Sequence, residues 1–301
     1  MKIAFHECKD VTQHAAQLPG WQQEFDQIET GHFAGEIVDI VGPGVRLYRE
    51  KANLGVSQSI HFPADQWHFV LPLNWSSNSL YRFDALTVLP SCEEFLSVAP
   101  ADYDLLVLSI ERQHHPWLER DEKKLRLLEV APALLTRLKQ EWRLLTEYSR
   151  YVEGTLPAVT QQAMLRQLQG GIELLLDTPS QRVTSDDSGN YRTRRYIVDR
   201  CHALTRLRPD APPSLMELCG QLKISRRTLQ YSFQSETGQT PIHYLRALRL
   251  NAVRRRLLQD PTVPLADAAA QHGFFHQSYF TREYRRLFLE PPSVTRQRLA
   301  G

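Results

Sequence analysis

The chain has 301 residues, 42% of them hydrophobic and 23% charged, which is enough for two domains that each bury a core. No run approaches the roughly 20 apolar residues of a membrane span, and the N-terminus lacks the apolar region of a cleaved signal. The four cysteines are scattered without a CxxC pair. We therefore expect reduced thiols and a cytoplasmic location, and neither a disulfide framework nor a cysteine zinc site.

The net charge of +2 conceals an asymmetry between the two halves of the chain. Residues 191–301 contain 19 Lys and Arg against 8 Asp and Glu, a net charge of +11, whereas residues 1–190 contain 17 against 26, a net charge of −9. Eighteen of the nineteen cations are arginines, whose planar guanidinium matches phosphates and guanine edges. This pattern indicates a basic module that meets a polyanion. A merely solvated basic surface is the alternative.

Residues 1–110 show short apolar runs separated by Gly, Pro and Asn at hairpin-like intervals. This rhythm predicts an antiparallel sandwich or a small barrel. The predicted strands are IVDIV, VRLYRE, WHFVLPL, SLYRF, LTVLP and YDLLVLSIE.

The apolar period then changes to three and four residues, which predicts a helix from Trp117 to about Tyr151, kinked or divided at Pro132. A second helix is predicted from about Pro157 through AVTQQAMLRQLQGGIELLLD. The apolar stripes of these helices either pack on the sheet or form a dimer interface, and both alternatives stay open. The polar run TPSQRVTSDDSGNYR, residues 178–192, predicts a linker, and about seven short helices are expected after it.

The basic half contains two copies of one pattern, 51 residues apart. Each copy has a helix, a short turn (Leu222–Ser225 or His272–His276) and a second helix, which is the helix-turn-helix arrangement. The small Cys219 and Ala270 at matching places allow the paired helices to approach closely. The matched pairs are Leu218 with Ala269, Cys219 with Ala270, Ile224 with Phe275, Leu229 with Phe280, and Phe233 with Tyr284.

A helical wheel divides the second helix of each copy into an apolar and a polar side. In the later copy Phe280, Tyr284 and Leu287 share one side, and Ser278, Arg282 and Arg285 share the other, with Gln277 and Thr281 beside them. In the earlier copy Leu229 and Phe233 lie opposite Arg227, Gln230, Tyr231 and Gln234. Arg, Gln, Ser and Thr are the side chains that hydrogen-bond base edges and phosphates. The two polar sides therefore predict DNA binding, with PIHYLRALRLNAVRRRLL as a helical spacer between successive major grooves.

These motifs resemble the DNA-binding domain of AraC/XylS-type transcriptional regulators over about residues 190–300. The resemblance is carried by ISRRTLQYSFQSETGQTPIHYLRALRLNAVRRRLL and LADAAAQHGFFHQSYFTREYRRLFLEPPSVTR. It implies DNA contacts by Arg226, Arg227, Gln230 and Tyr231 in the first recognition helix, and by His276, Gln277, Ser278 and Arg282 in the second. The ending departs from the family, because Glu290 and Thr295 stand where a glycine commonly precedes the prolines and a tyrosine follows them.

The front half, from LPGWQQEFDQIETGHFAGEIVDIV to VRLYRE, resembles the sensor region of the ethanolamine-operon activator subgroup of that family. The resemblance implies an α+β chain, with an N-terminal cupin-like β-barrel, two helices, and an all-α DNA-binding domain with two helix-turn-helix motifs. The expected boundaries are residues 1–115 for the sensor, 116–178 for the helices, 179–190 for the linker and 191–301 for the DNA-binding domain.

Catalytic and metal-binding patterns are absent from the sequence. No HxH occurs, His61 and His68 are seven residues apart, and His114 and His115 are neighbours that point apart. No GxSxG, HExxH or glycine-rich phosphate loop is present. We therefore expect no enzyme activity, no metal and no cofactor.

Small-molecule binding is the stronger hypothesis for the front domain, because a small barrel can enclose one ligand. Trp21, Trp67, Phe69, Trp75 and Tyr81 either line such an interior or form plain core, so no effector-binding residue is assigned. We expect promoter DNA, RNA polymerase and a small-molecule effector as partners, a homodimer as a possible assembly, and no membrane. The function is then an effector-responsive activator, or alternatively a constitutive DNA-binding regulator whose front domain only dimerises it.

Overall fold

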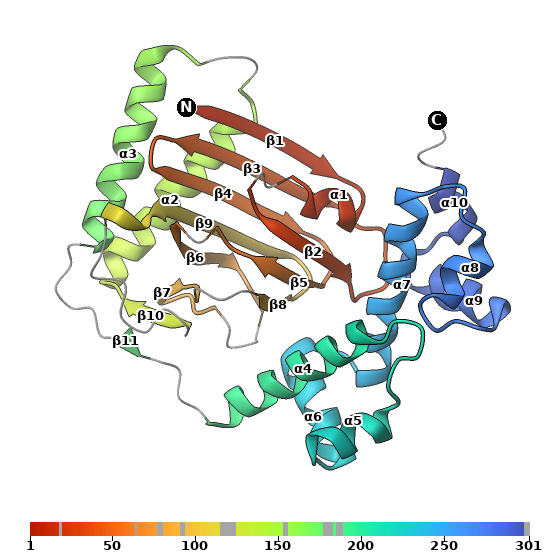
Figure 1. The fold of residues 1–301 in the computed structure, drawn as a ribbon. Coiled ribbons are helices and arrows are strands. Elements are labelled where there is room, and N and C mark those ends of the chain that lie inside the picture. Colours follow the sequence, from red (N-terminus) through yellow and green to blue (C-terminus); the bar gives the residue numbers. More distant parts are fainter. Residues whose placement is uncertain are drawn as a thin grey trace.

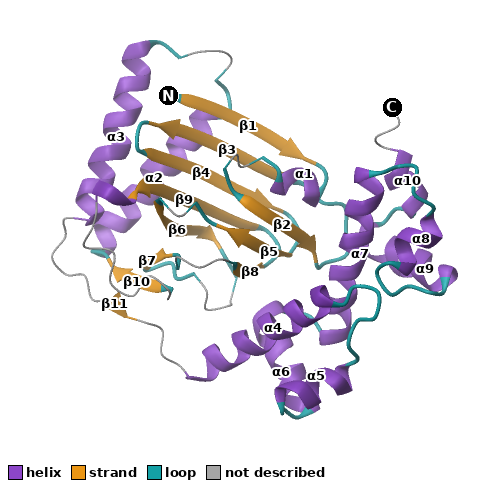
Figure 2. Cartoon of the chain, viewed as in Figure 1, coloured by secondary structure: helices purple, strands orange, loops and turns teal. Residues whose placement is uncertain are grey.

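The computed structural model of the chain describes residues 1–17, 20–63, 65–76, 81–90, 94–114, 125–152, 156–176, 183–184 and 189–297. Its strands lie in the N-terminal part and its C-terminal part is helical, as Figure 2 shows. The mixed α+β class and the order of a sheet-rich domain followed by a helical domain are confirmed. The predicted linker, residues 179–190, lies largely outside the described residues.

Two antiparallel sheets build the N-terminal domain, which we call the sheet domain (Figure 1). The large sheet has the order β1-β3-β4-β9-β6-β7-β10-β11, and the small sheet has the order β2-β5-β8. The large-sheet strands are β1 (Lys2–Cys8), β3 (Gly35–Gly42), β4 (Val45–Ala52), β6 (Gln66–Asn74), β7 (Ala85–Val88), β9 (Tyr103–Glu111), β10 (Arg126–Glu129) and β11 (Val183–Thr184). The small-sheet strands are β2 (Gln22–Gln27), β5 (Val56–His61) and β8 (Phe95–Ala99).

Alternation along the strands gives the large sheet two buried faces. In β9, Leu106 and Leu108 belong to the apolar core under the helices, whereas Leu105 and Val107 belong to the core between the two sheets. The β3–β4 hairpin turns through Pro43 and Gly44, and Gly44 has a φ of +68°, a value that glycine adopts without strain. The sheet domain is therefore a layer of helices, a large sheet and a small sheet.

Helices α2 (Pro132–Ser149) and α3 (Ala158–Leu176) cover the outer face of the large sheet, and the short elements α1 (Val11–Ala15) and η1 (Arg112–His114) complete the domain. The buried apolar residues of α2 and α3 pack on the large sheet, and the dimer interface stays a prediction. The prediction of a helix before Pro132 is wrong for the described residues. The Leu128 segment forms strand β10. Pro132 is the first residue of α2, a position where the missing backbone N–H of proline costs nothing because it would have no partner within the helix.

A single glycine permits close packing between the two covering helices. A Cβ on Gly171 of α3 would lie 3.0 Å from both Leu138 and Trp142 of α2. The fully buried Trp142 occupies the space that a side chain at position 171 would need. Gly171 is thus a point of close contact between α2 and α3, whereas its neighbour Gly170 faces open space.

The closed cupin-like barrel is not confirmed, because the described strands form two separate open sheets. The predicted strand SLYRF is wrong for its described part, since Tyr81–Phe83 form no strand. Trp21, Trp75 and Tyr81 lie between the sheets, as a ligand-lining role requires, but Trp67 and Phe69 pack towards α2 and α3.

The described residues of the C-terminal part form seven helices, which we call the helical domain (Figure 1). The central helix α7 is apolar on several sides, and its Tyr244, Ala247, Leu250 and Val253 are nearly inaccessible in the shared core. The helices are α4 (Gly189–Leu207), α5 (Leu215–Leu222), α6 (Arg226–Thr237), α7 (Pro241–Gln259), α8 (Leu265–Ala270), α9 (Gln277–Phe288) and α10 (Pro292–Gln297).

We predict that Phe280→Ala lowers the free energy of unfolding by roughly 3–5 kcal/mol, because it empties a fully buried site in the helical core. Phe275→Ala is the matched control, since that ring is 75% exposed and its loss leaves no cavity. Urea denaturation of the full chain, followed by circular dichroism, measures both. Equal destabilisation by the two variants would contradict the prediction.

Candidate nucleic-acid interface

The first helix-turn-helix unit is fixed by caps at each helix end. Ser214 and Glu217 form a capping box at the start of α5, and Ser225 accepts a hydrogen bond from the Thr228 backbone N–H at the start of α6. Between the helices, Lys223 adopts a left-handed φ of 53°, and the Ile224 N–H donates to the Cys219 carbonyl at 3.1 Å. This closed turn sets the direction of α6.

The second unit repeats the same geometry with one additional residue in its turn. Gly273 has a φ of +75°, and the Phe274 N–H donates to the Ala269 carbonyl at 3.0 Å. The first helix and the turn of the two copies therefore match at a spacing of 50 residues, and only the second helices match at 51. The predicted pairing of Ile224 with Phe275 is wrong, because Phe274 is the buried ring (3% exposed). Cys219 likewise corresponds to Ala269.

Both recognition helices bury the side that the wheel predicted. Leu229 and Phe233 of α6 are inaccessible, as are Phe280 and Tyr284 of α9. Glu283 of α9 also points inward, where Arg246 of α7 pairs with it at 3.1 Å. The apolar residues thus anchor α6 and α9 to α7.

The structure places all ten predicted DNA-contacting residues at the surface. Arg226 and Arg227 begin α6, and neither they nor Arg285 of α9 form an ion pair within the described residues. The exposed set is Arg226, Arg227, Gln230, Tyr231, Gln234, His276, Gln277, Ser278, Arg282 and Arg285.

Three of these side chains have partners in the free protein. Tyr231 accepts a hydrogen bond from Arg194 of α4 at 3.3 Å, and Gln234 donates to the Gly238 carbonyl at 3.1 Å. Arg282 contacts Glu283 at 3.2 Å and lies 5.2 Å from the centre of the Tyr279 ring, but it remains largely exposed. The side chain of Arg282 is 69% exposed, whereas Glu283 is buried and already pairs with Arg246, so most of the Arg282 guanidinium remains accessible to another anion.

Helix α7 separates the two units, so that α5 and α6 lie near one end of it and α8 and α9 near the other (Figure 1). Its 19 residues span about 28 Å at 1.5 Å per residue. Adding the widths of the recognition helices makes this span comparable to the roughly 34 Å between successive major grooves on one face of DNA. The described geometry is compatible with two helices reading one duplex.

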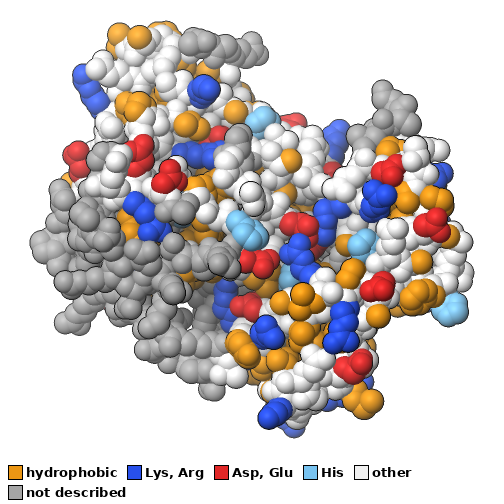
Figure 3. Space-filling view, in the orientation of Figure 1, with side chains coloured by type: hydrophobic (Ala, Val, Ile, Leu, Met, Phe, Trp, Pro, Cys, Tyr) orange, Lys and Arg blue, Asp and Glu red, His pale blue; other side chains and the backbone are white. Residues whose placement is uncertain are grey.

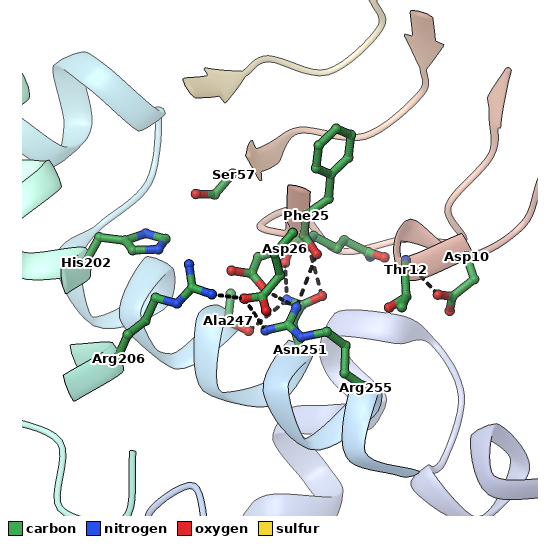
Figure 4. A network of polar contacts seen from close by, with 12 residues as sticks. Asp10, Thr12, Phe25, Asp26, Ser57, His202, Arg206, Ala247, Asn251 and Arg255 are labelled. Atoms are coloured by element: carbon green, nitrogen blue, oxygen red, sulfur yellow. Dashed lines mark hydrogen bonds and ion pairs between the residues drawn. The ribbon is translucent and has the colours of Figure 1, made fainter. Parts of the chain in front are cut away.

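The basic helices have a second role that the sequence pattern did not predict, which is attachment to the sheet domain (Figure 4). Asn251 of α7 accepts a hydrogen bond from the Gln27 backbone N–H at 3.0 Å and donates to the Gln27 carbonyl at 2.9 Å. Arg255 of α7 pairs with Asp26 at 2.5 Å and with Glu24 at 2.8 Å, and Arg206 of α4 also pairs with Glu24. On the face shown in Figure 3, basic and acidic side chains are intermixed where the two domains meet. Part of the opposite charge of the two halves is therefore neutralised inside the molecule.

Arg254 is more enclosed than the arginines Arg206 and Arg255 of the same junction. Its guanidinium contacts Asp10 of the sheet domain at 2.6 Å and Glu290, beyond α9, at 2.7 Å. Thr295 of α10 lies within hydrogen-bond distance of Arg254, Glu290 and Tyr284. Glu290 and Thr295, the two residues that depart from the family ending, thus hold one arginine. The left-handed residue of this ending is Leu289, with a φ of 55°.

A series of hydrogen bonds between uncharged side chains also crosses this junction. The hydroxyls of Ser57 in β5 and Tyr244 in α7 are 2.8 Å apart, and Tyr244 lies 3.0 Å from Nδ1 of His202 in α4. Burial, reinforced by the nearby Arg206 cation, lowers the pKa of His202 to about 3. The imidazole is therefore neutral at physiological pH.

No group of three or more His, Cys, Asp or Glu side chains suited to a metal ion occurs within the described ranges. Nor does any described helix combine the length and hydropathy needed to cross a bilayer. His115 and Cys92 lie outside the described residues.

Comparison with known proteins gives consistent results for the helical domain. A family model described as "Helix-turn-helix domain" matches residues 218–298. The chain is 36% identical over 85 residues to "XylDLEGF operon transcriptional activator 2" of Pseudomonas putida, covering 27% of this chain and 54% of that protein. It is 28% identical over 170 residues to "HTH-type transcriptional activator RhaR" of Klebsiella pneumoniae, covering 54% of this chain and 60% of that protein.

The matched region is thus less than two thirds of the length of these relatives. Among solved structures, the "AraC-like transcriptional activator CuxR" is 13% identical with a TM-score of 0.40, covering 89% of this chain and all of that one.

Acidification should destabilise the domain junction through His202. The pKa of His202 in the folded protein lies below the 6.5 of the free side chain, so the unfolded chain takes up a proton more readily. The free energy of unfolding is therefore unaffected by this group above pH 6.5 and decreases as the pH falls from 6.5 towards 3. Between pH 7 and 5 this one group should cost roughly 2 kcal/mol of unfolding free energy.

The His202→Asn variant should lose less stability over that interval than the wild type, as measured by urea denaturation at the two pH values. Tyr244→Phe is the control, because it removes the hydroxyl that bonds to Ser57 and His202 but keeps the imidazole of His202 that takes up the proton. An unchanged pH dependence in His202→Asn would show that His202 is not the group responsible.

Proposed function

We propose that this chain is a transcriptional regulator of the AraC/XylS family that binds promoter DNA through α6 and α9 and activates transcription. The observation that carries the proposal is the pair of exposed, arginine-bearing helices, each following a closed turn and sharing one apolar core with the common helix α7. Each helix would enter a major groove and present its polar side to base edges and phosphates.

The electrostatics of α6 support an anionic partner. Arg226 and Arg227 occupy the first turn of α6, where the helix dipole disfavours positive charge in the free protein. A phosphate at this position would remove that cost and accept hydrogen bonds from the free backbone N–H groups. Arg285 of α9 also has no carboxylate partner within the described residues. These cations, unlike those at the domain junction, are available to DNA.

Effector binding between the two sheets is supported by polar groups in an otherwise apolar core. Glu50 is buried there and accepts hydrogen bonds from Tyr103 at 2.5 Å and Gln58 at 2.9 Å. Nε1 of Trp21 and Nε2 of His68 are buried without a hydrogen-bond partner in the described part of the chain, and their rings are in contact. Unpaired buried polar atoms are costly, so a ligand that pairs with them would be stabilised. The closed cupin-like form of this domain remains part of the proposal.

The alternative is a constitutive regulator whose front domain only dimerises it. Exposed apolar residues on the covering helices favour this reading: Leu144, Tyr148 and Val159 are each more than half exposed. Size-exclusion chromatography with light scattering tests dimerisation, and a thermal-shift screen of metabolites tests effector binding. RNA polymerase contact, a cytoplasmic location and the absence of enzyme activity are further parts of the proposal. The regulator relatives support the last of these.

The base-reading role of α9 is tested by Arg282→Ala. We expect it to weaken binding to the specific site by about 1–3 kcal/mol and to relax base preference at one position. The specific site is first obtained by sequencing genomic fragments that the purified protein retains, and affinities are measured by fluorescence anisotropy. Arg137→Ala on α2 is the control, because it removes the same charge far from the proposed interface. Equal weakening on all sequences would instead make Arg282 a phosphate contact.

Binding to DNA should weaken steeply with salt, because each arginine that contacts a phosphate releases a condensed counterion. For about six to ten phosphate contacts, affinity should fall by roughly 10³- to 10⁵-fold between 50 and 200 mM salt. Anisotropy titrations with the specific duplex measure this slope. An affinity that stays flat over this range would refute DNA binding by the arginine-bearing helices.

A further inference from the structure

A cavity of about 470 Å³ lies at the junction of the two domains, apart from the interior of the sheet domain and from the recognition helices. Strand β2, helices α4 and α7, and the turn after α8 contribute to its walls. Its volume is within the range of small-molecule sites. Leu248 and Ala252 of α7 and Pro209 form an apolar part of the lining.

The lining has an excess of positive charge, with four arginines against two carboxylates. Both carboxylates, Glu24 and Asp26, are already paired with Arg255, and Glu24 is also paired with Arg206. The other two arginines, Arg249 and Arg256 of α7, have no contact with these carboxylates. The cavity therefore retains two cationic groups that the sheet domain does not neutralise.

Arg249 is held in place without a carboxylate partner within the described residues. Its guanidinium lies 4.6 Å from the centre of the Phe274 ring, and Nη1 is 3.5 Å from the Gly273 carbonyl. Burial and the neighbouring Arg246 lower its pKa. Arg249 is half-buried, and a partly desolvated cation without a counter-ion is unfavourable, so an anion would relieve this cost.

His272 contributes its imidazole to the same wall of the cavity. Burial, with the Arg255 and Arg249 cations, lowers the pKa of this imidazole, so the ring is neutral at physiological pH. A neutral imidazole offers one N–H donor, which suits an anionic oxygen.

We propose that this cavity binds a small organic anion, a carboxylate or a phosphate, through Arg249, Arg256 and His272, with the apolar part of the ligand against Leu248 and Ala252. Arg256 can take part because its pairing with Asp260 at 3.1 Å is partly exposed and therefore weak. The ligand would touch β2 and the turn before α9 at once. If the proposed function holds, occupancy would couple a metabolite to the position of a recognition helix.

The test is isothermal titration calorimetry of the full chain with inorganic phosphate and with benzoate, at constant ionic strength set by sodium chloride. We expect one site per chain for at least one probe, and an affinity about tenfold or more lower in Arg249→Gln and Arg256→Gln, since each removes a charged hydrogen bond. Arg200→Gln, an exposed arginine of α4 away from the cavity, should bind like the wild type. Binding of phosphate alone identifies a phosphate-bearing ligand, and binding of benzoate alone identifies a carboxylate.

The proposal is overturned if neither probe binds the wild type, or if both cavity variants bind as the wild type does. Thermal melts identify a variant that fails to fold, and Arg256→Gln at the partly exposed position then decides the outcome. DNA affinity measured without either probe reports on the proposed function, while calorimetry without DNA reports on the cavity. The two proposals can therefore fail separately.

Discussion

The position of every other element in the helical domain depends on how α7 is buried. This helix contacts both recognition units and the β2 strand, and it therefore has almost no face left for solvent. A helix enclosed on all sides must still satisfy its polar side chains. Asn251, Arg254 and Arg255 do so by bonding to the sheet domain. The stability of the helical domain therefore depends on its contacts with the sheet domain.

This arrangement changes the meaning of the charge asymmetry. From the sequence, the opposite charges of the two halves indicated an external polyanion. In the structure, Arg206, Arg254 and Arg255 meet carboxylates of the same chain, whereas Arg226, Arg227 and Arg285 meet none among the residues that the structure describes. The net charge could not show which arginines form ion pairs within the chain and which remain at the surface, because this depends on which helices pack against the sheet domain.

Much of the fold was predictable where a local pattern decides it. The alternating runs gave five strands of the large sheet, and the wheel identified the buried sides of α6 and α9. The small sheet was missed because its strands, such as QQEFDQ and VSQSIH, carry polar residues on both faces, and some of these pair with Tyr244 or Arg255 from the helical domain. The Leu128 segment was misassigned because Leu125 and Leu128 are three positions apart, which fits a helical period, and strand β10 is only four residues long. The one-residue shift in the second turn was invisible because Phe274 and Phe275 are chemically identical. The contacts of the ten surface residues with DNA, in turn, are not decided by exposure alone.

The Asn251 amide also has a consequence for the sheet it touches. Strand β2 is at the edge of the small sheet, and Asn251 binds both the N–H and the carbonyl of Gln27, as a neighbouring strand would. An uncovered strand edge invites pairing with another molecule and hence aggregation. The helical domain therefore covers the open edge of the small sheet, so that any separation of the two domains would expose β2 to pairing with another molecule.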